Sequence, residues 1–500
     1  MVFLMARKYV TRKEKREKDK ETDLLKEIVT IMRQYFPELI DRFNLLTDER
    51  HQSYVEYEMK VIFVVRLVGL LISMKSMHEM TRTLNTEEAI KNIAQICKVE
   101  LKELPHCDTM NNVFEKIKIE ELEEVNKYLI QRIIASKMCE KYKIRGRYYH
   151  IIVDGTGLAT SRIEYNKNCL VKNKTDKNGN SYQEYSTYVL EAKLVLGDMV
   201  FSIASEFVEN IRKKVKGYQK IESKKLQMKK TKKKAEKKSN IKNLSRDKFK
   251  QDCEIKAFKR LAKKIKANYP RLKILISGDA LYANKPVLDI CKENGWKYII
   301  RFKEGTIPTL YKEFDTVTRE VKDGNESNEE NKELKYEFAS KLDYNDYKIN
   351  IVRYTENSKE KEKEIETEFV YMTDLCLSNK NIIETVKVGR KRWKIENEGF
   401  NIQKNGTFDI GHLYSKNAIA IKVHYILIQI AHLLRQLLEK GSASIRDDIL
   451  FKRKTISEVS EILKKTLTTQ ISNLEQTKHM QLRFADQDYI DYIKEKKKNQ

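Results

Sequence analysis

Two short apolar runs that each lead to an aspartate constrain the fold of this chain most strongly. Residues 149–153 read YHIIV and run directly into Asp154, and residues 272–276 are followed by Ser-Gly and then Asp279. Apolar, β-branched runs of this length that are bounded by glycine predict central strands. We expect both strands to stop at these glycine turns, with an acidic side chain at the carboxyl end of each.

The hydrophobic pattern around these runs predicts the element order β-β-β-α-β-α-β. The further strands are expected at 185–196, 199–208 and 296–302, and the helices at 255–267 and 286–293. Gly197-Asp198 fits a two-residue hairpin turn between two of the strands. This is the order of a ribonuclease-H-like fold, an α/β fold with a mixed sheet core. Its first and fourth strands are neighbours, so Asp154 and Asp279 are expected side by side.

The remaining segments predict three further parts. Helical periodicity predicts a helical N-terminal domain at 1–145 and a charged helical C-terminal tail at 441–500. The core domain is expected at 146–440. Strand-like runs within 303–374 predict a β-rich insertion, and 380–404 and 418–439 are expected to form long helices.

Net charge points to the partner. The chain has 99 Lys and Arg against 73 Asp and Glu, a formal charge of +26, which indicates a polyanionic partner. Residues 211–250 alone hold 18 Lys or Arg and 3 Asp or Glu. This basic loop is either a solvated surface segment or an arm that lies along nucleic-acid phosphates, and the two interpretations are compatible.

Cysteines and apolar runs indicate the compartment. The seven cysteines are scattered without a CxxC pair, so neither a disulfide framework nor a thiolate zinc site is expected, and a reducing compartment fits. The longest apolar stretch, 61–74, is too short to span a bilayer and contains Arg66. We therefore expect a cytoplasmic protein that has no membrane partner.

A third carboxylate is predicted within 392–400. On an α-helix with Arg392 at 0°, apolar residues, Trp393 among them, fill an arc from about 280° through zero to about 120°. Glu396 falls near ~40°, inside that arc, whereas Glu398 falls near ~240° on the polar side. An inward-facing glutamate needs either a cation or a salt bridge, here with Arg392. Core packing is the default expectation for Trp393 and for Trp296.

Several segments together resemble the DDE transposases of the insertion-sequence 4 type. The matching segments are LPHCDT at 104–109, IVDGTGL at 152–158, QDCEIKAF at 251–258, GDALY at 278–282 and RWKIENEGF at 392–400. The family also has a Tyr-x2-Arg-x3-Glu-x6-Lys signature. Arg392 and Glu396 match it, but Gly389 stands at the Tyr position and Gln403 at the Lys position, with Lys404 one residue late.

The resemblance implies a DNA transposase that cuts and joins insertion-sequence ends. It implies that Asp154, Asp279 and Glu396 are the catalytic residues and bind two Mg²⁺ ions, for which Mn²⁺ can substitute. Arg392 and Lys404 are implied as DNA-binding residues that contact a phosphate near the cut. The implied partners are double-stranded DNA, as transposon ends and target, and a second copy of the chain as a homodimer in the DNA complex.

The resemblance also implies functions for the flanking parts, and it leaves alternatives open. The helical domain at 1–145 would bind the element's ends or dimerise, and the protein would be associated with the nucleoid. The altered Tyr and Lys positions leave open a transposase-derived, non-catalytic DNA-binding protein. A metal-dependent DNA nuclease without strand transfer is the other alternative.

Deletion of residues 211–250 is expected to weaken DNA binding and to flatten its dependence on salt, because fewer phosphates then release counterions when the protein binds. Affinity for an end-containing duplex, measured between about 50 and about 200 mM salt, checks this. A Gly/Ser linker of equal length is the control for spacing. An unchanged salt slope would reduce the segment to a spacer.

Overall fold

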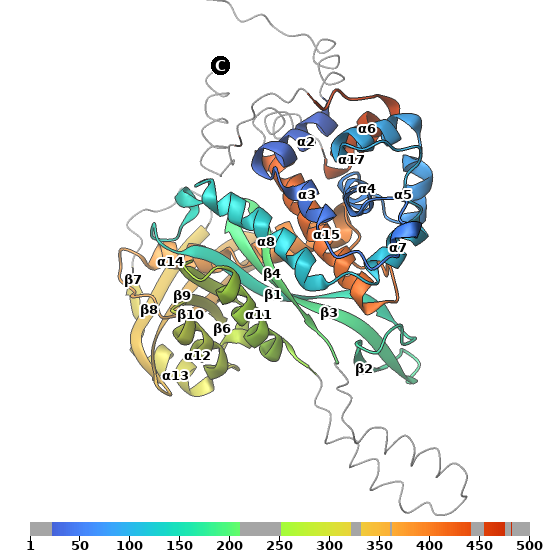
Figure 1. Ribbon diagram of the computed structural model, residues 1–500. Helices are drawn as coiled ribbons and strands as arrows, with labels where there is room; N and C mark the ends of the chain where they lie inside the picture. The colour runs from blue at the N-terminus through green and yellow to red at the C-terminus, as the bar shows by residue number, and fades with distance from the viewer. Residues whose placement is uncertain are drawn as a thin grey trace, which may run out of the picture.

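A computed structural model describes residues 23–210, 252–321, 332–360, 363–441, 455–475 and 482. A large mixed sheet flanked by helices lies beside a helical layer that is built from both ends of the chain (Figure 1). The basic loop 211–250 and most of the tail 441–500 lie outside the described residues.

The helical layer combines the N-terminal helices with two C-terminal ones. Its N-terminal members are α2 (Leu24–Tyr35), α3 (Leu39–Asn44), η1 (Gln52–Tyr54), α4 (Met59–Leu71), α5 (Met77–Leu84), α6 (Glu87–Cys97), α7 (Cys107–Phe114), α8 (Ile119–Ala135) and η2 (Glu140–Tyr142). The side chains of Asp23, Ser76 and Thr86 cap α2, α5 and α6. Helix α15 (Ala418–Gln436) packs against α4 and α8, and α17 (Ile456–Thr469) packs against α6 and α2. The described N-terminal and C-terminal helices therefore share one core.

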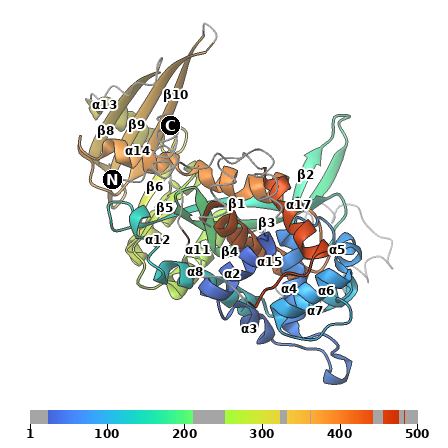
Figure 2. The same ribbon diagram turned by 90° about the horizontal axis from the view of Figure 1, so that it is seen from above.

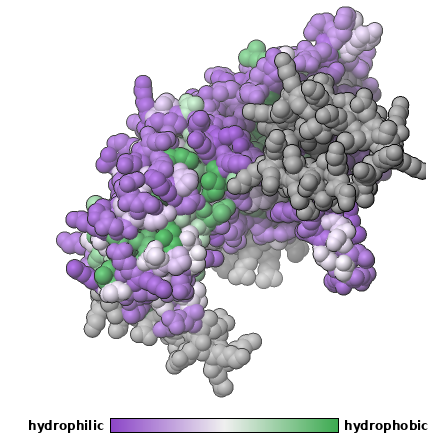
Figure 3. Space-filling model, turned by 90° about the horizontal axis from the view of Figure 1, so that it is seen from below, coloured by the Kyte–Doolittle hydropathy of each residue, from purple (hydrophilic) through white to green (hydrophobic). Residues whose placement is uncertain are grey.

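Helix α15 is the longest helix of the described residues and is mostly apolar. Together with the π-helical η5 (Leu437–Gly441) it forms a helix, Ala418–Gly441, that could cross a membrane by length and composition alone. However, 78% of its most apolar window is buried inside the molecule, which is how a core helix packs. Seen from below, the described surface is mostly hydrophilic with a smaller hydrophobic area (Figure 3).

One sheet contains the ten strands of the described residues and confirms the predicted fold class. They are β1 (Tyr149–Ser161), β2 (Leu170–Thr175), β3 (Ser181–Leu196), β4 (Met199–Val208), β5 (Ile274–Gly278), β6 (Lys297–Phe302), β7 (Arg319–Val321), β8 (Lys332–Tyr344), β9 (Tyr347–Glu360) and β10 (Lys363–Thr373). The order is β2-β3-β1-β5-β6-β10-β9-β8-β7, and β4 also pairs with β3. Strand β1 is antiparallel to β3 and parallel to β5, and β5 is parallel to β6. This is the ribonuclease-H-like arrangement.

The two faces of the sheet are covered by different helices. Because side chains alternate along a strand, Ile151 and Val153 join the core on the side of α11 (Glu254–Asn268), α12 (Lys285–Asn294) and α13 (Pro308–Val317). Ile152 points to the opposite face and packs with Ile395 and Phe400 of the π-helix η4 (Ile395–Gly406). Helix α14 (Ile382–Arg390) covers the same face over β5 and β6. Residues of β1 and β5 on this second face therefore point toward η4 and α14.

The β-rich insertion is present, but it extends the core sheet. Strand β10 pairs with β6, and β8 and β9 continue outward from it, away from the helical layer (Figure 2). The prediction missed α13, whose buried Leu310, Tyr311 and Phe314 have helical spacing. It also missed β2, because a largely exposed strand carries no burial pattern.

The predicted single helix over 380–404 is wrong. Helix α14 ends at Arg390, and the chain resumes as the π-helix η4 at Ile395. The wide turns of a π-helix take more residues than α-helical turns, so positions calculated for an α-helix do not hold here.

A buried polar network ties the sheet to α15 and η4. Glu191 and Lys193 of β3 are both fully buried, with Lys193 Nζ 4.0 Å from Glu191 Oε1. Glu191 accepts hydrogen bonds from Ser202, Ser205 and Tyr425. The ammonium of Lys193 donates to Gln429 Oε1 at 2.8 Å, and the same oxygen accepts from Gln403 Nε2 of η4 at 2.8 Å. The network therefore fixes η4 against the sheet.

The substitution Glu191→Ala is expected to destabilise the fold by about 3–5 kcal/mol, because it leaves Lys193 buried without its countercharge. Urea unfolding followed by circular dichroism measures this loss. On the same strand, Glu184 pairs with Lys174 at the surface, so Glu184→Ala should lose far less stability. Equal losses for the two variants would contradict the stabilising role of the network.

Candidate active site

The pairing of β1 with β5 brings two aspartates together. The register joins Tyr149 to Ile274 and Ile152 to Ser277, so continuing it by two residues sets Asp154 opposite Asp279. Each aspartate is two residues beyond Ile152 or Ser277, so both share the face of those residues, which lies under η4. The charge of Asp279 acts on the Asp154 carboxyl, which agrees with this proximity.

Asp154 lies inside its strand, so the predicted strand end is wrong. Beyond the last pair with β5, strand β1 stays paired with β3, with Asp154 opposite Glu191, and continues to Ser161. Gly155 does not make a turn. A Cβ at this position would lie 2.3 Å from the Tyr188 hydroxyl, so glycine is needed for the close approach of this ring. By contrast, Asp279 follows β5 directly and caps the short helix η3 (Ala280–Tyr282).

Arg392 links the third carboxylate to the first. Its Nη1 atom lies 2.7 Å from Glu396 Oε1 and 3.5 Å from Asp154 Oδ2. The two carboxylate oxygens can therefore be no farther apart than the sum of these distances. Because the charges of Asp154, Asp279 and Glu396 all act on Arg392, its guanidinium lies among the three acidic groups.

Glu396, rather than Glu398, faces the aspartates, but the predicted reason is wrong. Its side chain is 50% exposed at the rim and does not lie within an apolar arc. Glu398 points elsewhere and binds Lys440 Nζ at 2.5 Å. Trp393 is 43% exposed, against the expectation of core packing, whereas Trp296 is buried as predicted. The break after Arg390 and the π-helical turns account for these differences.

The residues at the two altered signature positions are both packed against neighbouring side chains. Gln403 is fully buried and bonds to Gln429 and His432, while Lys404 is exposed and close enough for the Asp154 charge to act on it. Gly389 packs against the Tyr371 ring of β10, where a Cβ would lie 2.8 Å from the ring. Lys404 is thus the basic residue of η4 that lies beside the carboxylates.

Burial and crowded negative charge perturb the first aspartate. Burial raises the pKa of Asp154 to about 6, and the charges of Asp279 and Glu396 add to the rise. A hydrogen bond from Gly155 N and the charge of Arg392 act in the opposite direction. A carboxylate with so high a pKa gains from a nearby cation.

Glu254 is a fourth acidic residue near the site, and sequence reasoning gave it no role. It opens α11 and accepts hydrogen bonds from Tyr188 Oη at 2.6 Å and Tyr282 Oη at 3.2 Å. Burial, Glu254 and the two aspartates raise the pKa of both phenols. An acidic residue at the start of an amphipathic helix, within the matching QDCEIKAF segment, was the available signal.

The donor set fits hard divalent cations. Its ligands would be carboxylate oxygens, which Mg²⁺ and Mn²⁺ prefer. Asp154 Oδ1 accepts from Gly155 N and Asp279 Oδ1 accepts from Leu281 N, both at 2.9 Å, so each carboxylate is held by its own backbone. The excess negative charge, balanced here by Arg392, is the condition that bound cations relieve.

A ribonuclease-H-like sheet with an acidic rim of this kind is typical of enzymes that process polynucleotides. Residues 240–447 match the family model described as transposase DDE domain group 1, and residues 40–128 match the model described as DDE_Tnp_1-associated. Together the two matches cover more than half of the chain, which belongs to the DDE transposases. No curated protein matches it. The first match includes Asp279, Arg392 and Glu396, whereas Asp154 lies between the two matched regions.

The substitution Asp154→Asn is expected to stabilise the cation-free protein above pH 6. A carboxyl whose pKa rises from 3.8 to about 6 on folding binds its proton more tightly in the folded state, so stability falls as pH rises through this interval. The neutral amide avoids a loss on the order of 3 kcal/mol. Unfolding in EDTA from pH 4 to pH 8 should show a gain for the variant that disappears at the acid end.

Asp289 is the control with the opposite sign. Its hydrogen bonds from Tyr347 and Lys285 lower its pKa, so Asp289→Asn should lose stability at neutral pH. A gain for Asp154→Asn that does not depend on pH would contradict the charge-crowding argument.

Proposed function

We propose that this chain is a DNA transposase that cuts and joins insertion-sequence ends by phosphodiester hydrolysis and strand transfer. The observation that supports this most is the convergence of Asp154, Asp279 and Glu396 around one guanidinium, from three separate parts of the chain. The family match supports the same class of reaction on DNA.

The three carboxylates would hold two Mg²⁺ ions, or Mn²⁺ in their place. Two such ions supply activation of the attacking oxygen and charge stabilisation of the leaving oxygen. The β1–β5 register positions the two aspartates, and the buried contacts of Gln403 hold η4, and with it Glu396, against them. The protein's part in the reaction is to fix these ligands before DNA arrives.

Arg392 and Lys404 would hold the DNA. Both are cationic and close to the carboxylates, so a phosphate near the cut would be bound from the side of η4. Arg392 can offer a planar pair of donors to a phosphate, and Lys404 offers a point charge.

The remaining parts of the chain would organise the DNA complex. We assign end binding or dimerisation to the helical region 1–145, catalysis to 146–440, and electrostatic support to the basic loop 211–250. The protein would act as a homodimer on paired ends in the cytoplasm, associated with the nucleoid and without a membrane partner.

Alanine at Asp154, Asp279 or Glu396 is expected to leave DNA binding intact and to reduce Mg²⁺-dependent cleavage to background, because each removes a cation ligand. Cleavage and joining of duplexes that carry the element's own ends measure both steps. Glu398→Ala is the matched control and should keep most of its activity, because Glu398 contacts Lys440 and not the aspartates.

The outcomes separate the candidate functions. Cleavage without joining would favour a nuclease, and DNA binding without either step would favour a non-catalytic derivative. An inactive Glu398→Ala protein beside an active Glu396→Ala protein would overturn the assignment of the third ligand.

A further inference from the structure

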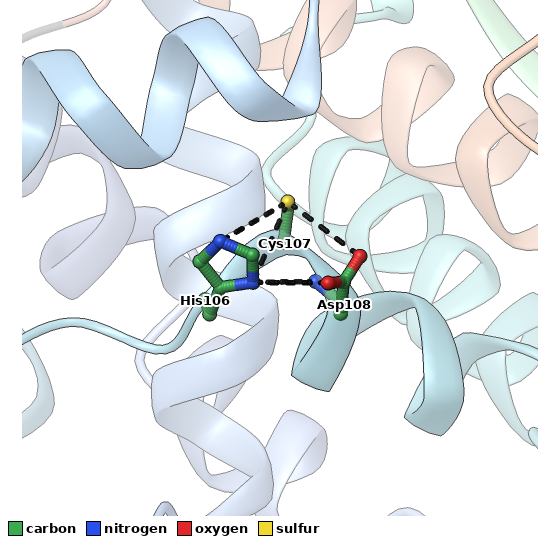
Figure 4. Close-up of side chains that lie close together, drawn as sticks. All are labelled: His106, Cys107 and Asp108. Atoms are coloured by element: carbon green, nitrogen blue, oxygen red, sulfur yellow. Dashed lines mark hydrogen bonds and ion pairs between the residues drawn. The ribbon is translucent and has the colours of Figure 1, made fainter.

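A second group of metal-ligating side chains lies in the helical layer, away from the carboxylate site. His106, Cys107 and Asp108 follow one another where the chain enters α7, and one donor atom of each lies within 4.8 Å of the others. Figure 4 shows the imidazole, thiol and carboxylate converging. His78, in the first turn of α5, adds a fourth donor, with its Nδ1 3.3 Å from Cys107 Sγ.

The spacing of these donors fits a tetrahedral site. With Zn–S near ~2.3 Å and Zn–N near ~2.0 Å, tetrahedral geometry sets sulfur and nitrogen about 3.5 Å apart. The distances from Cys107 Sγ are 3.3 Å to His78 Nδ1, 3.7 Å to His106 Nδ1 and 3.9 Å to Asp108 Oδ1. His106 Nδ1 lies 3.4 Å from Asp108 Oδ2. The three separations from the sulfur are thus within about 0.4 Å of the value for a tetrahedral site.

The group has one buried member and three exposed ones. Cys107 is buried in the hydrophobic core, whereas His78, His106 and Asp108 are exposed. A cation can thus enter from solvent and meet a sulfur that the core holds in place. Burial raises the pKa of the Cys107 thiol, so a bound cation must displace its proton.

We propose that His78, His106, Cys107 and Asp108 form a binding site for a borderline-soft divalent cation of the Zn²⁺ class. Sulfur and imidazole ligands select such cations over Mg²⁺, so this site and the all-oxygen carboxylate site take different metals. The sequence predicts no thiolate zinc site, because the chain has no CxxC pair. The proposed ligands have a different spacing: three come from one continuous run, and His78 lies 29 residues before Cys107.

The bound cation would join two helices. His78 belongs to α5 and the other three ligands to the start of α7, and these helices are in contact. A shared ion would cross-link them and stabilise the helical layer by a free energy that grows with the logarithm of the ion's concentration relative to its Kd. The structural role is independent of DNA cleavage.

Cobalt binding to the full-length protein tests the site. The background is an Asp279→Ala chain treated with EDTA and dialysed, so that the carboxylate site is disabled. Addition of Co²⁺ should give a thiolate-to-cobalt charge-transfer band and the intense visible bands of tetrahedral Co²⁺, saturating at one ion per chain. Cys107→Ser should remove the charge-transfer band. Cys376→Ser, which removes an exposed free thiol elsewhere, should leave it unchanged.

Thermal unfolding provides the second measurement. Zn²⁺ should raise the Tm of the Asp279→Ala chain but not that of the same chain with His78→Ala, while the two have similar Tm values without metal. Absence of the charge-transfer band, its survival in Cys107→Ser, or an equal Zn²⁺ shift with His78→Ala would each overturn the proposal. DNA cleavage by the chain with intact carboxylates is measured separately, so failure of this site and failure of the transposase function are distinguishable.

Discussion

The parallel register between β1 and β5 is the constraint on which the acidic site depends. A slip of one residue would turn Asp154 or Asp279 to the α11 face and separate their carboxylates, because side chains alternate along a strand. The register is held by apolar packing on both faces, with Ile151 and Ile276 on one side and Ile152 and Leu275 on the other. Ordinary core packing thus fixes a pair of like charges at a short separation.

Arg392 balances the charge repulsion at this rim, because its guanidinium lies among the carboxylates. Glu254 adds a further negative charge on the α11 side of the sheet, where it accepts hydrogen bonds from two tyrosine hydroxyls. The ladder also sets Asp154 opposite Glu191, whose charge is neutralised by Lys193 and three hydroxyl donors. A site that gathers anions therefore depends on buried polar groups in the strand beside it.

The sequence predicted those parts of the fold that burial patterns encode. The order of strands and helices around Asp154 and Asp279 followed from apolar runs, and the hairpin at Gly197-Asp198 from its turn residues. The strand end at Gly155 was misplaced because this glycine accommodates the ring of Tyr188, a tertiary contact. Strand β2 was missed because it is largely exposed and has no apolar face. Glu396 shares Arg392 with Asp154 and Glu398 does not, but Glu396 was selected from an α-helical wheel that the π-helix does not follow.

Hydrogen bonds join the end of β4 to the start of α11, so the connection between them begins and ends at neighbouring residues. Glu209 N donates to Asp252 Oδ2 at 3.3 Å, and Arg260 binds both Asp252 and the Phe207 carbonyl. Because these contacts hold both ends of the connection together, its length does not affect the geometry of the sheet. A change in the length or charge of that connection would therefore leave the strands that carry Asp154 and Asp279 in place.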